Sequence, residues 1–98
     1  MVKHIIIWKL KEEIDQESVK AEIKRELEGL VGKIEGLLEM KIMIEGYACS
    51  AGDLLMDSTF ESKAALDAYQ AHPAHQKIAN GLVRPNAAAR LSFDYEVS

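Results

Sequence analysis

The chain has 98 residues, with 12 basic and 16 acidic side chains and a net charge of −4. This charge repels nucleic-acid phosphates and anionic lipids, so the sequence predicts neither a nucleic-acid partner nor a membrane partner. The composition, 48% hydrophobic and 29% charged, is typical of a globular protein, and the length fits one domain over residues 1–98. Because a core of this size stabilises a fold only marginally, we expect a partner subunit.

The sequence also bears on the compartment. The longest apolar run, residues 5–8, is far too short to span a membrane, and residues 1–4 lack the layout of a signal peptide. The expected location is therefore the cytoplasm. Cys49 is the single cysteine, so an intrachain disulfide and a cysteine-based zinc site are excluded, and we interpret it as a structural thiol.

The first predicted elements are a strand and a helix. Residues 2–11 are apolar on both faces, which is typical of a strand in the middle of a sheet. Asp15 can cap the next helix, which is expected to end at Gly36 after Gly29 and Gly32 weaken its last turns. Its apolar stripe recurs at helical spacing, at Val19, Ile23, Leu27, Leu30 and Ile34.

Two strands follow, joined by a short loop over residues 46–52. Apolar and polar residues alternate over residues 38–45, which predicts a strand whose buried face carries Leu38, Met40, Ile42 and Ile44. Residues 53–60 form the next strand, with one face made of Leu54, Met56, Ser58 and Phe60. We expect these two strands to pair as a hairpin.

A second helix is predicted to begin at Ser62 and to end at His72, because Pro73 disfavours helical angles in the residue before it. Pro73 can itself start a new short helix over residues 73–80, before Gly81 breaks it. This segment therefore contains a helix break.

The last strand, residues 89–97, has the most regular alternation in the chain, with an apolar face made of Ala89, Leu91, Phe93, Tyr95 and Val97. The order of elements is then βαββαβ. Right-handed crossovers place the first and third strands at the centre of an antiparallel four-stranded sheet, which is an α+β, ferredoxin-like fold.

Helices in this fold cover one face of the sheet only. The opposite face would expose apolar residues to water, namely Ile5, Ile7, Met43 and Leu55. Two copies packed face to face would bury this surface, and a two-fold dimer is the commonest closed solution. We therefore expect a homodimer that forms through the sheet face.

The segment of residues 68–77 carries the main candidates for a site. The imidazole of His75 titrates near neutrality and can take a proton from a carbon next to a carbonyl, although it can equally cap the short helix. Tyr69 lies six residues earlier, where its hydroxyl could polarise a substrate carbonyl or its ring could fill the core.

His4 is the third candidate, since it is a polar residue on an apolar strand face. It is either a buried, hydrogen-bonded residue or the polar group of an apolar pocket. If its face looks toward the helices, His4 and His75 share one cavity. The candidate substrate-binding residues, each with core packing or helix capping as its alternative, are Ile6, Trp8, Phe60, Leu66 and His72.

We expect no metal and no cofactor. His72 and His75 are three apart, but the proline between them interrupts the helix that would align them, and no His-Glu-x-x-His pattern is present. No serine lies in a Gly-x-Ser-x-Gly turn, and glycine-rich phosphate loops are absent.

Three stretches together resemble one family, the stress-responsive A/B barrel (Dabb) family: "VKHIIIWKLK", "DLLMDSTFESKAALDAYQAHPAH" and "ARLSFDYEV". The resemblance spans nearly the whole chain and implies a dimeric α+β barrel. One plant branch of this family is a polyketide cyclase that uses a histidine base, a tyrosine and a first-strand histidine. By position these resemble His75, Tyr69 and His4.

Two hypotheses follow. The first is a cofactor-free enzyme that acts on a small apolar carbonyl or polyketide-like compound, with His75 as base, Tyr69 as hydrogen-bond donor and His4 as orienting group. Cofactor-free monooxygenases among related dimeric barrels keep oxidation open by analogy. The second is a non-catalytic, stress-associated dimeric module or a carrier of a small hydrophobic ligand. An open cavity between sheet and helices favours chemistry or carriage.

Overall fold

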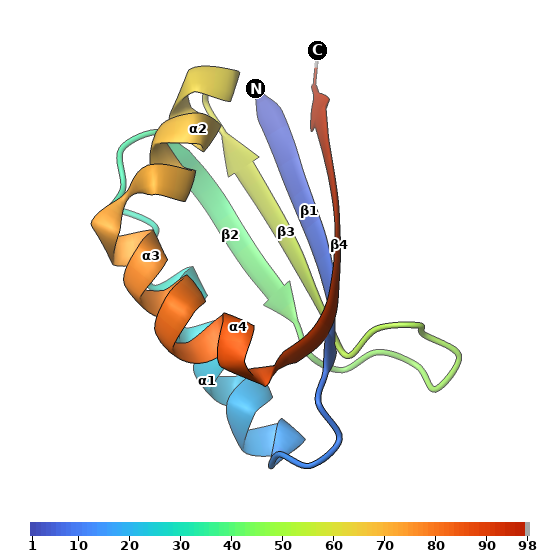
Figure 1. The fold of residues 1–98 in the computed structure, drawn as a ribbon. Coiled ribbons are helices and arrows are strands. Elements are labelled where there is room, and N and C mark those ends of the chain that lie inside the picture. The colour runs from blue at the N-terminus through green and yellow to red at the C-terminus, as the bar shows by residue number, and fades with distance from the viewer. Residues whose placement is uncertain (98) are drawn as a thin grey trace.

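The computed structural model describes residues 1–97, so Ser98 of the predicted domain lies outside the described residues. Figure 1 shows an α+β fold with one sheet and a layer of helices. The sheet is antiparallel in the order β2-β3-β1-β4, which is the predicted ferredoxin-like arrangement. The elements are β1 (Val2–Leu10), α1 (Gln16–Glu28), β2 (Leu37–Met43), β3 (Leu54–Phe60), α2 (Lys63–Ala71), α3 (Pro73–Ile78), the π-helical turn η1 (Ala79–Val83), α4 (Arg84–Asn86) and β4 (Ala87–Glu96).

The central position of β1 is confirmed, because this strand pairs with β3 on one side and with β4 on the other. Its helix-facing side is buried and carries Val2, His4, Ile6, Trp8 and Leu10. These side chains, with those of β3, form the floor of the core beneath the helices.

The predicted end of the first helix at Gly36 is wrong, since α1 ends at Glu28 and Gly29 is its C-cap. Turns follow in which Gly32 and Gly36 adopt φ angles of 90° and 86°. These left-handed angles are open to glycine at little cost and cannot continue a right-handed helix. The apolar stripe still reaches the core, because Leu30 and Ile34 are buried within these turns.

The hairpin of β2 and β3 is confirmed, but the predicted buried face of β2 is wrong at one residue. Leu38 is 45% exposed, whereas its neighbour Leu37 is buried. The pairing register shifts between Leu37 and Glu39, and such a bulge reverses the faces of the residues before it. Ile44 lies beyond the end of β2 and packs on the edge of the core.

The helix break at Pro73 is confirmed, and Ser62 caps α2 by accepting a hydrogen bond from the Ala65 N–H at 3.1 Å. The predicted break at Gly81 is wrong. The helix continues through η1 and α4 to Asn86, and a side chain at Gly81 would meet nothing within 4 Å. A glycine in an exposed helix costs only about 1 kcal/mol relative to alanine, which the rest of the helix tolerates.

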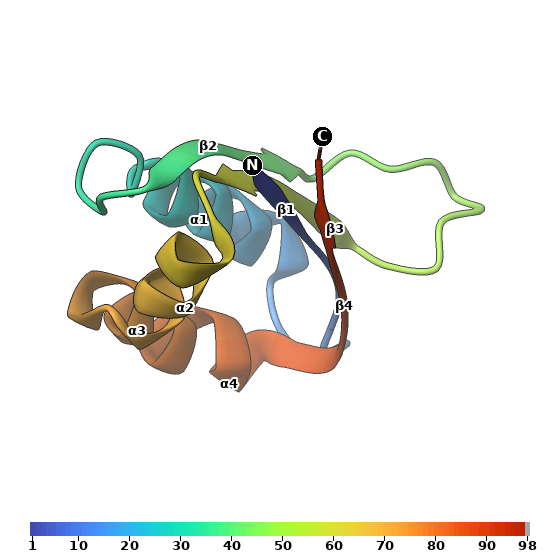
Figure 2. The ribbon, with the colours of Figure 1, turned by 90° about the horizontal axis from the view of Figure 1, so that it is seen from above.

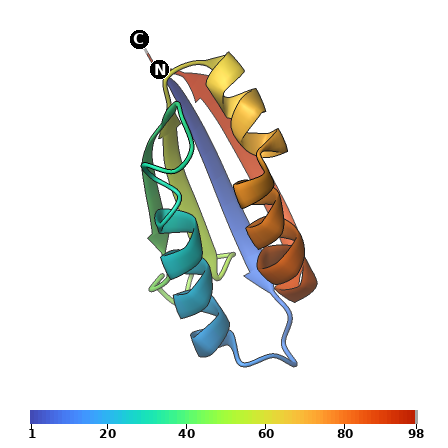
Figure 3. The same ribbon diagram turned by 90° about the vertical axis from the view of Figure 1, so that its left-hand side faces the viewer.

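The helices lie in two rows over one face of the sheet. Figures 2 and 3 show α1 in one row and α2, α3 and α4 in the other, with the opposite face of the sheet uncovered. Within residues 1–97, no helix has both the length and the apolar character needed to cross a membrane.

The uncovered face carries the apolar side of β4. Leu91 and Phe93 are 74% and 69% exposed there, close to Ile7 and Ile5, their partners in β1. The polar side of β4 therefore faces the helices. Through the same register Arg90 lies opposite Trp8, Ser92 opposite Ile6 and Asp94 opposite His4.

Candidate functional site

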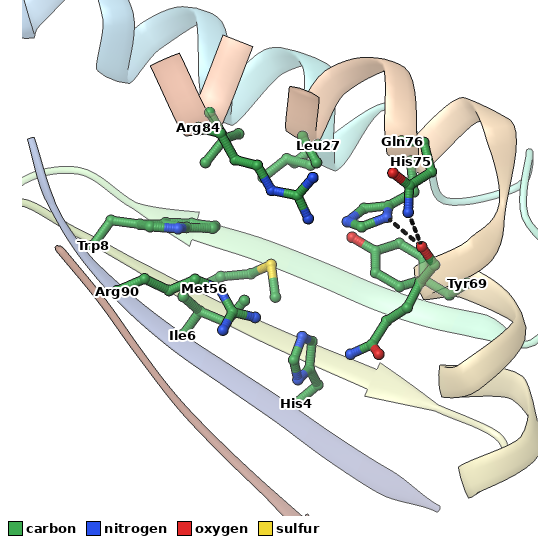
Figure 4. A pocket seen from close by; sticks show the side chains of 13 residues that line it. His4, Ile6, Trp8, Leu27, Met56, Tyr69, His75, Gln76, Arg84 and Arg90 are labelled. Atoms are coloured by element: carbon green, nitrogen blue, oxygen red, sulfur yellow. Dashed lines mark hydrogen bonds between the residues drawn. The ribbon is translucent and has the colours of Figure 1, made fainter. Parts of the chain in front are cut away.

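A cavity of about 430 Å³ lies between the sheet and the row of helices formed by α2, α3 and α4. This volume is within the range of small-molecule sites. Figure 4 shows side chains that enter it from both layers. The lining residues are His4, Ile6 and Trp8 from β1, Met56 from β3, Arg90 from β4, Leu27 from α1, Tyr69 and Gln70 from α2, His75 and Gln76 from α3, Ala79 and Val83 from η1, and Arg84 from α4.

His75 lies on the helix side of the cavity, and its Nδ1 is 3.3 Å from the carbonyl oxygen of Gln70. A carbonyl can only accept, so Nδ1 carries the proton and the neutral ring keeps a lone pair on Nε2. Figure 4 shows this second nitrogen turned toward the cavity. Burial lowers the pKa of His75, outweighing the Gln70 hydrogen bond that raises it, and the neighbouring side chains of Arg84, His4 and Arg90 lower it further.

Tyr69 lies beside His75, with ring centroids 4.3 Å apart. Its ring is buried against Phe60, at a centroid distance of 4.9 Å, and its hydroxyl end reaches the cavity (Figure 4). Burial raises the pKa of the Tyr69 hydroxyl well above its usual range. The group therefore stays protonated near neutral pH and can donate a hydrogen bond.

His4 enters the cavity from the sheet side, so the two histidines expected to share a cavity do line the same one. The Nδ1 atom of His4 is hydrogen-bonded to the Asp94 carboxylate on the neighbouring strand. A carboxylate that accepts from one ring nitrogen fixes the orientation of the imidazole and leaves the other nitrogen for a ligand.

The other predicted binding residues divide into two groups. Ile6 and Trp8 line the cavity and form its apolar floor together with Met56. Phe60 and Leu66 are fully buried and belong to the core instead of the cavity wall. His72 is also outside the lining, because its Nδ1 accepts a hydrogen bond from the Ala74 N–H at 3.0 Å and caps α3.

Sequence reasoning missed the two arginines. Arg84 and Arg90 both line the cavity, and Figure 4 shows their guanidinium groups turned toward the same space from the helix side and the sheet side. The alternation of the last strand could have identified Arg90, because it stands on the same face as Asp94. No local pattern marks Arg84, whose position depends on the continuation of the helix past Gly81.

The arrangement brings together one neutral imidazole, one tyrosine hydroxyl, one carboxylate-bound imidazole and two guanidinium groups around an apolar floor. Such groups can move a proton and stabilise negative charge on a bound oxygen. Within residues 1–97, no group of three or more His, Cys, Asp or Glu side chains is arranged to hold a metal ion.

Comparison with families of known proteins gives one match, over residues 2–97, to the family described as the stress responsive A/B barrel domain. No curated protein matches the sequence.

Solved structures include several with the same fold. A dimeric ferredoxin-like protein of unknown function from Jannaschia sp. is 29% identical, with a TM-score of 0.78 and coverage of 98% of each chain. A dimeric ferredoxin-like protein of unknown function from Bacteroides fragilis is 23% identical, with a TM-score of 0.88, over 98% of this chain and 95% of that one. The hydroxynitrile lyase from Passiflora edulis is 18% identical, with a TM-score of 0.83, over 99% and 93%. The last two, below 25% identity, show the fold alone, whereas the Jannaschia protein, at 29%, is described as dimeric.

Proposed function

The chain belongs to the stress-responsive A/B barrel (Dabb) family, and we propose that it is a cofactor-free enzyme that removes a proton from a carbon next to a carbonyl group. The observation that carries this proposal is the pairing of a neutral His75 with the Tyr69 hydroxyl on one wall of an open cavity. The neighbour from Passiflora edulis is a hydroxynitrile lyase, an activity that is consistent with proton chemistry on this fold.

His75 is the proposed base. Its Nδ1–H is held by the Gln70 carbonyl, and its lowered pKa keeps Nε2 free to accept a proton at neutral pH. A base with a pKa near the working pH combines the correct protonation state with a useful driving force for transfer.

Tyr69 and His4 are the proposed partners of the substrate oxygen. The Tyr69 hydroxyl donates to the carbonyl oxygen and stabilises the negative charge that develops there. His4, oriented by Asp94, contacts the substrate from the sheet side. The apolar floor of Ile6, Trp8 and Met56 excludes water and holds the carbon chain.

In the proposed reaction the proton stays within the cavity. The proton leaves the substrate carbon for Nε2 of His75, and the electron pair of the broken C–H bond forms an enolate whose oxygen accepts from Tyr69. In an intramolecular aldol closure, the enolate carbon forms a C–C bond to a second carbonyl, and His75 returns its proton to the new alkoxide. No external oxidant or reductant is needed.

Exchange of α-protons in D₂O tests this step without knowledge of the natural substrate. The probes are the methyl ketones 2-octanone and 7-oxooctanoate, followed by NMR. We expect exchange above the buffer rate with the wild-type protein and loss of this excess in His75→Ala. His72→Asn is the matched control, because it also removes an imidazole but leaves a residue that can cap α3. Equal exchange in wild type and His75→Ala would overturn the proposal.

A carrier of a small apolar ligand is the second candidate, favoured by the same open cavity. A carrier would bind the ketones without accelerating exchange, so the D₂O experiment separates the two functions. The stress-associated module that the resemblance implies would neither bind the ketones nor accelerate their exchange.

We also propose that the homodimer forms through the uncovered sheet face and that the protein acts in the cytoplasm. The sheet-face interface is supported by the exposed apolar side chains Leu91, Phe93 and Tyr95 of β4. Burial of this patch against a second copy stabilises the pair by about 25 cal/mol for each Å² removed from water.

A further inference from the structure

The two arginines of the cavity carry charges that have no ion-pair partner among residues 1–97. The ion pairs of the described residues involve some of the lysines, His4, Arg25 and the N-terminus, and none includes Arg84 or Arg90. Arg84 donates only to the neutral side chain of Asn80. Two guanidinium groups turned into one cavity without carboxylates form a positively charged rim (Figure 4).

The nearest carboxylate on the same strand does not neutralise this rim. Asp94 stands four residues from Arg90 along β4, which corresponds to about 13 Å in an extended strand. That carboxylate is already engaged by His4. At such a distance salt and water screen most of its attraction for Arg90, since the screening length is about 8 to 10 Å at ordinary ionic strength.

The rim of the cavity is charged and its floor is apolar, which favours a ligand that is charged at one end and apolar at the other. Arg84 and Arg90 are exposed at the mouth of the cavity, whereas Ile6, Trp8 and Met56 beneath them are buried. Guanidinium groups recognise carboxylates through paired N–H donors. A ligand with a charged head and an apolar tail would satisfy both regions at once.

We propose that the substrate of this cavity is a carboxylate, with its charged head bound by Arg84 and Arg90 and an apolar chain of medium length lying over Ile6, Trp8 and Met56. This inference rests on the proposed function, because it names the substrate class of the same cavity. It does not depend on turnover, because the binding of a carboxylate can be measured without any reaction.

Trp8 supplies the readout, because it is the only tryptophan of the chain and lines the cavity. The probes are octanoate and octanamide, which differ in charge but not in chain length and do not absorb where tryptophan is excited. Each is titrated into the whole protein while Trp8 fluorescence is followed. We expect octanoate to bind at least about tenfold more tightly than octanamide, a difference of about 1.4 kcal/mol.

The variants Arg84→Gln, Arg90→Gln and the double variant test the rim. We expect each single change to weaken octanoate binding and the double change to abolish its advantage over octanamide. Arg25→Gln is the matched control, since it removes the same charge from an exposed site on α1 that does not line the cavity. Circular dichroism of each variant checks that the fold is intact.

Several results would overturn the carboxylate proposal: equal affinity for the two probes, an advantage of octanoate that survives in the double variant, or no binding of either probe at millimolar concentration. The outcome is independent of the exchange experiment. Selective octanoate binding without His75-dependent exchange would reject the enzyme and keep the carboxylate site. His75-dependent exchange of 2-octanone without selective octanoate binding would support the enzyme and reject the carboxylate site.

Discussion

The rings of Tyr69 and His75 lie side by side, with centroids 4.3 Å apart and planes inclined by 39°, although the two residues belong to different helices. The break between α2 and α3 makes this contact possible. His72 ends one helix and caps the next, so the chain changes direction between the two rings. A continuous helix would place residues six apart on different faces.

Tyr69→Phe separates the chemistry of this pair from its packing. The ring contacts with Phe60 and His75 remain, and only the hydroxyl at the cavity is lost. We expect the free energy of unfolding to change by less than about 1 kcal/mol, while His75-dependent exchange falls about a hundredfold. Tyr69→Ala, which removes the buried ring, should cost about 3 to 5 kcal/mol. Thermal melts and exchange rates measure the two effects, and undiminished exchange in Tyr69→Phe would remove the hydroxyl from the mechanism.

The pH dependence follows from the lowered pKa of His75. Only the neutral ring can accept a proton, so exchange should fall as pH decreases through a pKa below about 6.5, the ordinary value for histidine. The unfolded chain binds this proton more readily, so the contribution of His75 to stability is present above about pH 6.5 and is lost as pH falls through the folded-state pKa. NMR titration of the His75 ring measures this pKa directly, and a value above 6.5 would contradict the assignment.

Arg84→Gln should raise the pKa of His75, because the guanidinium charge is one of the causes that lower it. The acid limb of the exchange profile should move to higher pH by the same amount. Arg25→Gln, which makes the same charge change outside the cavity, should leave both unchanged. An NMR titration that gives the same His75 pKa in wild type and Arg84→Gln would show that the two side chains are not coupled.

Much of the fold could be predicted because it depends on periodic burial. The strand alternation and the helix stop at Pro73 are local signals, and they define four strands in the correct order. The errors arise where a single residue breaks the period. The bulge beside Leu38 reverses one side chain. The helix ends at Glu28, and the left-handed angles of Gly32 and Gly36 keep the chain from resuming it although the apolar stripe continues.

The site was predictable in part for the same reason. His4, Trp8 and Ile6 share a strand face, and the sequence therefore places them together. Arg84 could not be found this way, because no local pattern marks it. The alternation of β4 indicates the face of Arg90, but no pattern in the sequence pairs it with Arg84, which comes from another element. Their approach depends on the register of β4 against β1 and on the π-helical turn η1 that carries the chain to α4.

Gly36 tests how closely the turns after α1 pack on α2. A Cβ atom at this residue would lie 2.6 Å from the Cβ of Ala65, and φ is 86°. Gly32 has a similar φ of 90° but nothing within 4 Å, so it is the matched control. We expect Gly32→Ala to cost about 1 kcal/mol from backbone strain and Gly36→Ala about 2 to 4 kcal/mol, because steric overlap is added. Chemical denaturation measures both, and equal losses would show that α2 can move away.

Phe93→Glu tests the proposed dimer interface. Phe93 is 69% exposed on the uncovered sheet face, and a charge there could not be buried against a second copy without a large desolvation cost. We expect the dimer to dissociate at least about a hundredfold more readily, as is typical of an aromatic residue that anchors an interface. Val31→Glu is the control, since it places the same side chain at an exposed apolar residue in the turns after α1. Analytical ultracentrifugation distinguishes the two, and a Phe93→Glu protein that remains dimeric would exclude this face.

Asp94 tests the role of His4, because its carboxylate accepts the hydrogen bond from His4 Nδ1. Asn at this residue keeps an oxygen acceptor and so can hold the ring in place, whereas Ala leaves the ring unrestrained. If His4 acts through its orientation, Asp94→Asn should retain exchange within about twofold and Asp94→Ala should lower it about tenfold, a barrier increase of about 1.4 kcal/mol. Because Asp94 is exposed, neither change should alter the melting temperature by more than a few degrees. An equal loss of exchange in the two variants would show that the reaction depends on the negative charge of Asp94 and not on the orientation that it gives the His4 ring.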